Sequence, residues 1–153
     1  MSERSEQLER FRTGYAAVEE ALVGATDEEL DRQPPEGWTA RQVVHHLADS
    51  EAIAFVRLRR LIAEDDPLIG GYDEPEYARR LHYDRPIASS LAVLRAVRDA
   101  SLELLESLSE DEWNRSGTHS ESGAYPVERW LRIYSKHSHD HAEQIRKARR
   151  GEQ

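Results

Sequence analysis

The stretch TARQVVHHLADSEAIAFVRLRRLIAE, residues 39–64, is the longest helical pattern in the chain and decides the fold. Thr39 and Gln42 have the spacing of a capping box, which predicts that the helix begins there. From that point apolar side chains return every three or four residues, the spacing of one helical face. The members of this face are Val43, His46, Leu47, Ser50, Ala54, Leu58 and Leu61. Such a face must be covered by other helices.

Three further segments, residues 5–23, 86–108 and 126–149, show the same periodicity. Pro86 stands at a first-turn position, where proline is favoured, and Pro126 opens the last segment. Strand patterns are nearly absent, because there are no alternating β-branched runs and no Asn-Gly or Asp-Gly hairpin signals. The sequence therefore predicts an all-α four-helix bundle that forms one domain over residues 1–153.

The connection between the second and third helices is unusually long. It reads EDDPLIGGYDEPEYARRLHYD, residues 64–84, which is more than a tight antiparallel turn needs. This length allows the third helix to run parallel to the second. Its Tyr, Leu and Ile side chains predict an ordered link that packs on the bundle and contains about one helical turn. The first connection holds a capping box at Thr26 and Glu29.

Composition excludes several classes of function. With 21 Lys and Arg against 30 Asp and Glu, the net charge is −9, the wrong sign for a nucleic-acid binder. No apolar run approaches the roughly 18 residues that span a membrane, and the first residues lack the apolar segment of a signal peptide. The absence of cysteine excludes disulfide scaffolds and Cys-based metal sites. We expect a cytoplasmic protein without nucleic-acid or membrane partners.

Three of the seven histidines fall where a metal could bind. His137 and His141 are four residues apart, so their side chains lie on one face of the last helix. His46 lies in the apolar face of residues 39–64, ~10 Å from the start of that helix, and His141 lies ~12 Å from the end of the last one. If these helices are antiparallel neighbours, all three rings reach one level. Two imidazoles one turn apart, joined by a third from another helix, can converge on one ion.

The alternative is that these rings are ordinary hydrogen-bonded core residues. Each imidazole has two nitrogens to satisfy, and few polar neighbours are available at that level, so the set as a whole favours a metal site. The remaining histidines have other phases or positions. His45 points about 100° away from His46, and we expect His82, His119 and His139 to face solvent.

The segments WTARQVVHHLADSE (38–51), LAVLRAVRDASLELLESLSEDEW (91–113) and GAYPVERWLRIYSKHSHDHAEQIRKAR (123–149) resemble the DinB-like (DinB/YfiT) family of bacterial metal-binding helix bundles. The resemblance covers residues 36–149. It implies an up-down-down-up bundle and a divalent metal held by His46, His137 and His141, with water in the open positions. Ser138 and Asp140 depart from the family's Asp and His, which leaves the ligands in place but changes their surroundings.

Three imidazole ligands leave at least one coordination position open, as in catalytic sites, and zinc or nickel suits them. Such an ion lowers the pKa of a bound water or thiol. The resemblance favours transfer of sulfur from a low-molecular-weight thiol cosubstrate to a small-molecule substrate. Hydrolysis by a metal-activated water and metal binding without catalysis are the alternatives. For hydrolysis, Asp49 lies about 60° from His46 and is a better placed base than Glu51 at about 140°.

Other residues of the inner faces have two possible roles. Arg98 lies on the inward stripe of residues 86–108, so it is either paired with an acid or anchors an anionic substrate, and Arg57 raises the same question. Val44 and Phe55 lie opposite the main face of their helix, where they form a homodimer surface or are covered by the long link. The possible pocket residues are Ser50, Arg98, Trp130, Tyr134 and Gln144. Core packing is the favoured role of Trp130 and Tyr134, and Gln144 could orient a ligand or water.

Overall fold

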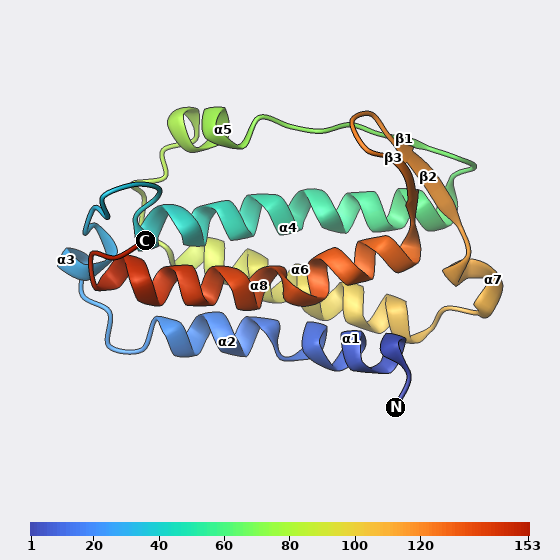
Figure 1. The fold of residues 1–153 in the computed structure, drawn as a ribbon, viewed down its shortest axis with the longest axis horizontal. Coiled ribbons are helices and arrows are strands. Elements are labelled where there is room, and N and C mark those ends of the chain that lie inside the picture. Colours follow the sequence, from blue (N-terminus) through green and yellow to red (C-terminus); the bar gives the residue numbers. More distant parts are fainter.

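A computed structural model describes all residues 1–153, and four helical rods lie side by side in its main body (Figure 1). The rods are α1 (Glu3–Arg12) with α2 (Gly14–Ala21), α4 (Ala40–Ala63), α6 (Ala88–Glu106) and α8 (Val127–Arg149). In Figure 1 the chain runs one way along α1, α2 and α8 and the opposite way along α4 and α6. The shorter helices α3 (Asp27–Leu30), α5 (Glu74–Arg80) and α7 (Glu110–Trp113) lie in the connections. The predicted helical bundle is confirmed.

Helix α4 begins where its capping box predicts. The Thr39 side chain accepts a hydrogen bond from the Gln42 backbone N–H at 3.2 Å, and Gln42 Oε1 accepts one from Thr39 N–H at 2.9 Å. This capping box fixes the start of α4, so it also fixes how far His46 lies from the end of the bundle. Helix α6 begins at Ala88, two residues after Pro86, and the Arg85 carbonyl just before it accepts a hydrogen bond from His45 Nε2 at 2.9 Å.

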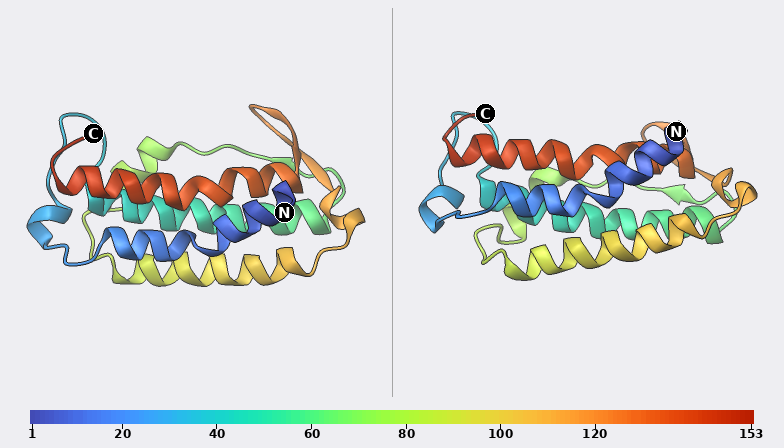
Figure 2. Two further views of the ribbon diagram at one scale, coloured as in Figure 1. Left: turned by 60° about the horizontal axis from the view of Figure 1, so that its bottom comes forward. Right: turned by 90° about the horizontal axis from the view of Figure 1, so that it is seen from below.

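The first rod is two helices, so the prediction of one helix over residues 5–23 is wrong. Arg98 Nη2 donates to the Phe11 carbonyl at 2.8 Å, and this carbonyl is lost to the helical ladder. The break falls at Thr13 and is visible as a bend in Figure 2. A Cβ atom at Gly14 would lie 2.4 Å from Arg98 Nη2, so a glycine is needed at the start of α2 for the arginine to fit.

Three short strands lie outside the bundle, which corrects the expectation of a chain without strands. They are β1 (Leu68–Ile69), β2 (Ser116–His119) and β3 (Gly123–Pro126). They form a sheet in the order β1-β2-β3, in which β2 is parallel to β1 and antiparallel to β3. A Cβ at Gly117 would lie 2.6 Å from the Pro67 carbonyl oxygen, so this glycine lets the link approach β2. These strands are short and pair through their backbones, so their sequences carry no β-branched alternation that would predict them.

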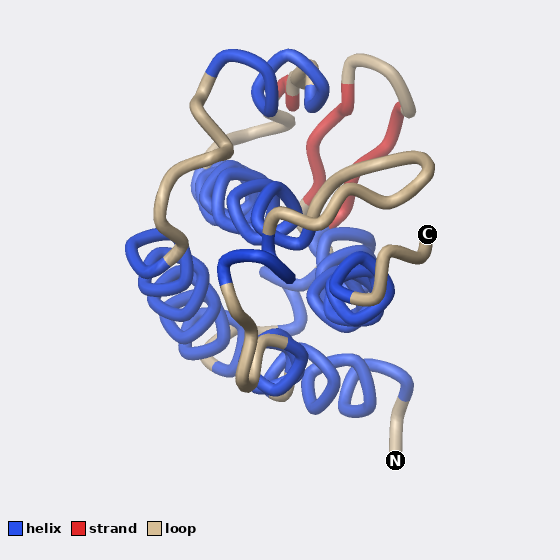
Figure 3. Tube along the Cα trace, turned by 90° about the vertical axis from the view of Figure 1, so that its left-hand side faces the viewer, coloured by secondary structure: helices blue, strands red, loops and turns tan.

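The long link is ordered, as predicted, and contains α5. Asp73 caps this helix by accepting a hydrogen bond from the Glu76 N–H at 3.2 Å. Viewed along the bundle in Figure 3, α5 and the strands lie on the same outer side of the helices. No helix has the length and apolar character needed to cross a membrane.

The buried core consists of two apolar clusters with a polar layer between them. One cluster contains Val43, Leu47, Leu94, Ala142 and Ile145, and the other contains Leu58, Leu61, Leu105, Trp130 and Leu131. The buried polar residues between them along the helices are Ser50, Glu51, Arg98, Ser101, Ser135 and Ser138. A polar layer at this depth requires internal partners, and the histidines lie at the same level.

The two side chains proposed for a dimer surface are engaged within the chain. Val44 is fully buried and belongs to the same apolar cluster as Leu94 of α6. Phe55 is half-buried, and the guanidinium of Arg59 lies 3.2 Å from the centre of its ring. Val44 is therefore part of the core and offers no exposed surface to a partner.

Candidate metal centre

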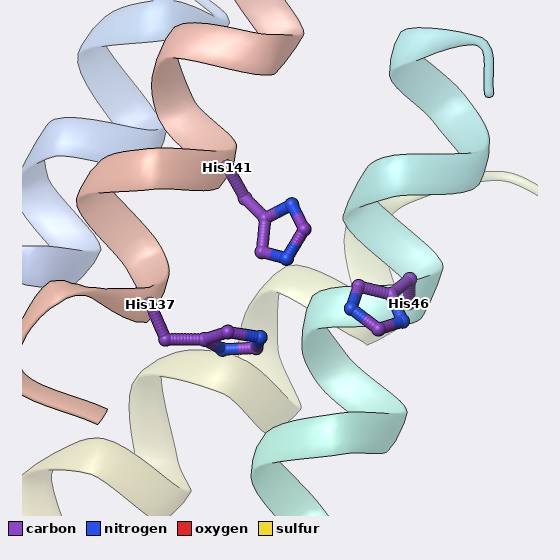
Figure 4. Close-up of side chains that lie close together, drawn as sticks. All are labelled: His46, His137 and His141. Carbon is purple, nitrogen blue, oxygen red and sulfur yellow. The ribbon is translucent and has the colours of Figure 1, made fainter. Parts of the chain in front are cut away.

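The structure brings together the three histidines that the sequence selects. His46 of α4 faces His137 and His141 of α8, and one donor atom from each lies within 4.8 Å of the others (Figure 4). The ring centres of His137 and His141 are 4.6 Å apart, and that of His46 is 4.8 Å from His141 and 5.7 Å from His137. This is a cluster that can hold one metal ion.

Aromatic side chains close the cluster at both ends. The ring of Trp38, which directly precedes the cap of α4, lies 4.8 Å from His46. The ring of Tyr134, one helical turn before His137, lies 5.5 Å from that histidine. These two contacts limit the freedom of the imidazoles.

The imidazoles are held in the form that binds metals. Burial, together with the neighbouring His141 and His137, lowers the pKa of His46 to about 3. Burial likewise lowers the pKa of His141 to about 4, with His137 acting in the same direction. Both rings are therefore neutral at pH 7, and a neutral ring has a lone pair to offer to a cation.

Two of the rings are oriented by acceptors behind them. His137 Nδ1 donates to Glu51 Oε2 at 3.3 Å, and His141 Nδ1 donates to Gln144 Oε1 at 2.7 Å. A ring that donates through Nδ1 keeps its lone pair on Nε2, so these partners fix the tautomer and aim Nε2 into the cluster. His46 forms no hydrogen bond. The hydrogen bond from His141 supports the predicted role of Gln144 in orienting a ligand.

Behind His137 lies a buried ion pair. Glu51 and Arg98 are both only 3% exposed and are directly hydrogen-bonded. Arg98 also donates to the carbonyls of Tyr134, at 3.3 Å, and Phe11. Burial raises the pKa of Glu51, but the charge of Arg98 and the contact with His137 outweigh it, so the carboxyl pKa lies below its usual range. Of the two roles considered for Arg98, the structural ion pair is the one observed.

The interpretation of the two acids of α4 requires correction. The carboxylate of Asp49 accepts a hydrogen bond from the Tyr83 hydroxyl at 2.7 Å, whereas Glu51 contacts His137. An angle measured from His46 alone is misleading because α4 is buried on more than one side. The signal that could have identified Glu51 is Arg98 itself, since a buried arginine needs an acid partner.

The remaining pocket candidates are buried in different ways. Trp130 is a core residue, and its Nε1 donates to the Ala54 carbonyl at 2.9 Å. Tyr134 packs between Trp130 and His137, at 4.9 Å and 5.5 Å between ring centres. Ser50 is buried one helical turn after His46. Of these three, Tyr134 touches both the core and the cluster.

Four histidines lie outside the cluster. His82 is exposed, as expected. His139 is half-buried and corrects the expectation of a solvent-facing ring, because its Nε2 donates to the Arg10 carbonyl of α1 at 2.8 Å. His119 is also half-buried and stacks on Tyr125 at 5.7 Å. His45 is fully buried; it donates to the Arg85 carbonyl and accepts from the Ser90 hydroxyl at 2.7 Å, so its role is structural.

Comparison with known proteins finds relatives over most of the chain. The sequence model of the DinB superfamily matches residues 10–145. A protein of Oceanobacillus iheyensis named "putative metal-dependent hydrolase" is 36% identical over 129 residues, which cover 84% of this chain and 75% of that protein. YfiT of Bacillus subtilis, with the same description, is 33% identical over 133 residues, or 85% of this chain and 75% of YfiT.

Solved structures show the same arrangement of helices. YfiT of Bacillus subtilis, described as a probable metal-dependent hydrolase with an unusual four-helix bundle topology, matches with a TM-score of 0.88 at 29% identity over 98% of this chain and 89% of that chain. The mycothiol-dependent maleylpyruvate isomerase matches with a TM-score of 0.74 at 18% identity over 94% of this chain and 61% of that chain, a likeness of fold. The chain belongs to the DinB superfamily.

Proposed function

We propose that this protein is a metal-dependent enzyme acting on a small molecule, in which His46, His137 and His141 hold one divalent ion, zinc or nickel. The observation that carries the proposal is the meeting of three imidazole donors within 4.8 Å, two of them with Nδ1 committed to an acceptor. Neutral nitrogen donors in this number suit zinc and nickel and leave coordination positions open.

When bound, a divalent ion among neutral ligands retains its full charge and lowers the pKa of a water or thiol beside it. The protein's own groups keep the ligands in place. Glu51 and Gln144 hold the rings of His137 and His141, and Arg98 keeps Glu51 ionised so that it remains an acceptor. We also propose the up-down-down-up order of helices; the opposite directions of α4 and α8 in Figure 1 support it.

Hydrolysis is the reaction that the relatives support, since the curated proteins at 36% and 33% identity are both named as metal-dependent hydrolases. Sulfur transfer from a low-molecular-weight thiol, which the sequence resemblance favours, is the second candidate. One observation favours it: Glu51 is committed to Arg98 and His137, and Asp49 to Tyr83, so neither carboxylate is free to accept a proton from water. A thiol needs such a base less, because its pKa is far below that of water.

The test measures turnover of zinc-loaded and nickel-loaded protein on chromogenic esters, amides and electrophiles, with and without low-molecular-weight thiols. Turnover that needs no thiol supports hydrolysis, and turnover that needs one supports transfer. His141→Ala should abolish either activity, whereas His139→Ala, on the same helix but docked on α1, should retain it. Metal bound at full occupancy without any turnover would contradict an enzymatic role and favour a metal-binding bundle.

A further inference from the structure

Arg57 is a half-buried arginine of α4 with no acidic partner. Its hydrogen bond, from Nη2, goes to the Gly70 carbonyl of the link at 2.7 Å. Two other arginines of the same helix are paired with acids, Arg41 with Asp31 at 2.7 Å and Arg60 with Glu64 at 3.2 Å. Arg59 also lacks an acid, but its guanidinium lies over the Phe55 ring and donates to the Phe55 carbonyl and to the Ser101 hydroxyl. A guanidinium carries five N–H donors, so most of those on Arg57 remain available to an anion.

The position of Arg57 relates it to the metal centre. It follows His46 by eleven residues, so it lies within about 20° of the same helical face and ~16 Å further along α4. The guanidinium lies near Tyr134, whose ring is 5.5 Å from that of His137.

A cavity of about 370 Å³ lies beside Arg57, within the size range of small-molecule sites. Its apolar wall consists of Ala52, Ile53, Val56 and Ile69. Two cations border it, Arg57 and Arg60, but Arg60 is committed to Glu64. The cavity therefore combines an apolar wall with one uncompensated positive charge. This combination suits a ligand that has an apolar body and an anionic end.

Two phenols connect this region with the histidines. The hydroxyl of Tyr72, in the link, is buried and has no hydrogen-bond partner. Burial raises the pKa of Tyr72 to about 12, and Arg57 is among the charges that oppose this rise, so the guanidinium lies near the ring. Arg57 acts in the same way on Tyr134, whose pKa is raised by burial and whose ring contacts His137. A protonated phenol is a donor, as Arg57 is.

We propose that Arg57 binds the carboxylate of the substrate, and that the substrate class is a small carboxylic acid with an apolar body extending from this cavity toward the three histidines. This inference rests on the proposed function, because the carboxylate that Arg57 would bind belongs to the substrate of the proposed metal-dependent enzyme. The guanidinium of Arg57 carries it, because it borders the cavity without an acidic partner and keeps N–H donors for a carboxylate beyond the one used by Gly70.

Binding of 4-phenylbutanoate and of its neutral amide, 4-phenylbutanamide, measured by calorimetry on zinc-loaded and on metal-free protein, tests the proposal. The acid should bind wild-type protein at least about tenfold more tightly than the amide, the scale of a charge-assisted hydrogen bond. Arg57→Met should remove this preference. The matched control Arg60→Met, in the same cavity wall, should keep it. Removal of zinc should leave the preference within about twofold.

Equal affinity for acid and amide, no binding of the acid up to about 10 mM, or equal loss in Arg60→Met would overturn the proposal. A preference that disappears with the zinc would also overturn it, because the ion rather than Arg57 would then hold the carboxylate. Since the readout is binding to metal-free as well as loaded protein, it stands even if no catalytic turnover is found. A failure of the proposed enzymatic function is thereby distinguished from a failure of this assignment.

Discussion

The replacement Arg98→Met tests whether the buried ion pair behind His137 stabilises the bundle. Arg98 and Glu51 are each 3% exposed, and methionine has a similar length without the charge. The change leaves an ionised carboxylate in the core with His137 as its remaining partner, and it frees the carbonyls of Phe11 and Tyr134. Breaking one side of a buried pair costs about 3–5 kcal/mol. For a chain of this size we expect the Tm to fall by roughly 6–20 °C.

The pair is best measured as a double-mutant cycle by thermal and urea unfolding at pH 7. Glu51→Gln with Arg98→Met removes both charges, so it should recover at least about half of the loss of Arg98→Met. Arg95→Met, on the exposed side of the same helix, is the control and should change stability by less than about 0.5 kcal/mol. A loss of under about 1 kcal/mol in Arg98→Met, or a double variant as unstable as the two single losses added together, would refute the reasoning.

Two further predictions concern packing and pH. Gly14→Ala places a Cβ 2.4 Å from Arg98 Nη2 and should lower the free energy of unfolding by about 1–3 kcal/mol. The control Gly70→Ala, with open space around it, should have little effect. Equal urea midpoints of the two variants would contradict this prediction. Metal-free protein should lose stability as the pH falls below about 6.5 toward 4. The pKa values of His46 (about 3) and His141 (about 4) lie below their values in the unfolded chain, so the unfolded chain binds protons first. Urea midpoints between pH 7 and 5 check this, and a variant with glutamine at both positions should show a flatter slope.

The parts of the structure that depend on one helix at a time could be predicted from the sequence. The capping box at Thr39 fixes the start of α4, and the 3.6-residue period places His137 and His141 on one face. These two facts select the three histidines that meet in the structure, provided that the two helices are antiparallel neighbours.

The parts that depend on residues distant in sequence could not be predicted. The break at Thr13 arises because Arg98, from another rod, takes the Phe11 carbonyl. The strands β1 and β2 pair through backbone atoms of the link and of a loop that contains Gly117, without a β-branched pattern. The role of Glu51 does not follow from its angle to His46 on α4, because its partner Arg98 comes from α6.

Metal content is the measurement that tests the central claim most directly. Protein purified without a histidine tag and equilibrated with zinc should contain about one ion per chain by elemental analysis, as expected for one three-histidine site. His46→Ala, His137→Ala and His141→Ala should each reduce this content to near zero, while His139→Ala should retain it. Wild-type protein that binds no zinc, or a His139→Ala variant that loses as much as the other three, would contradict the account.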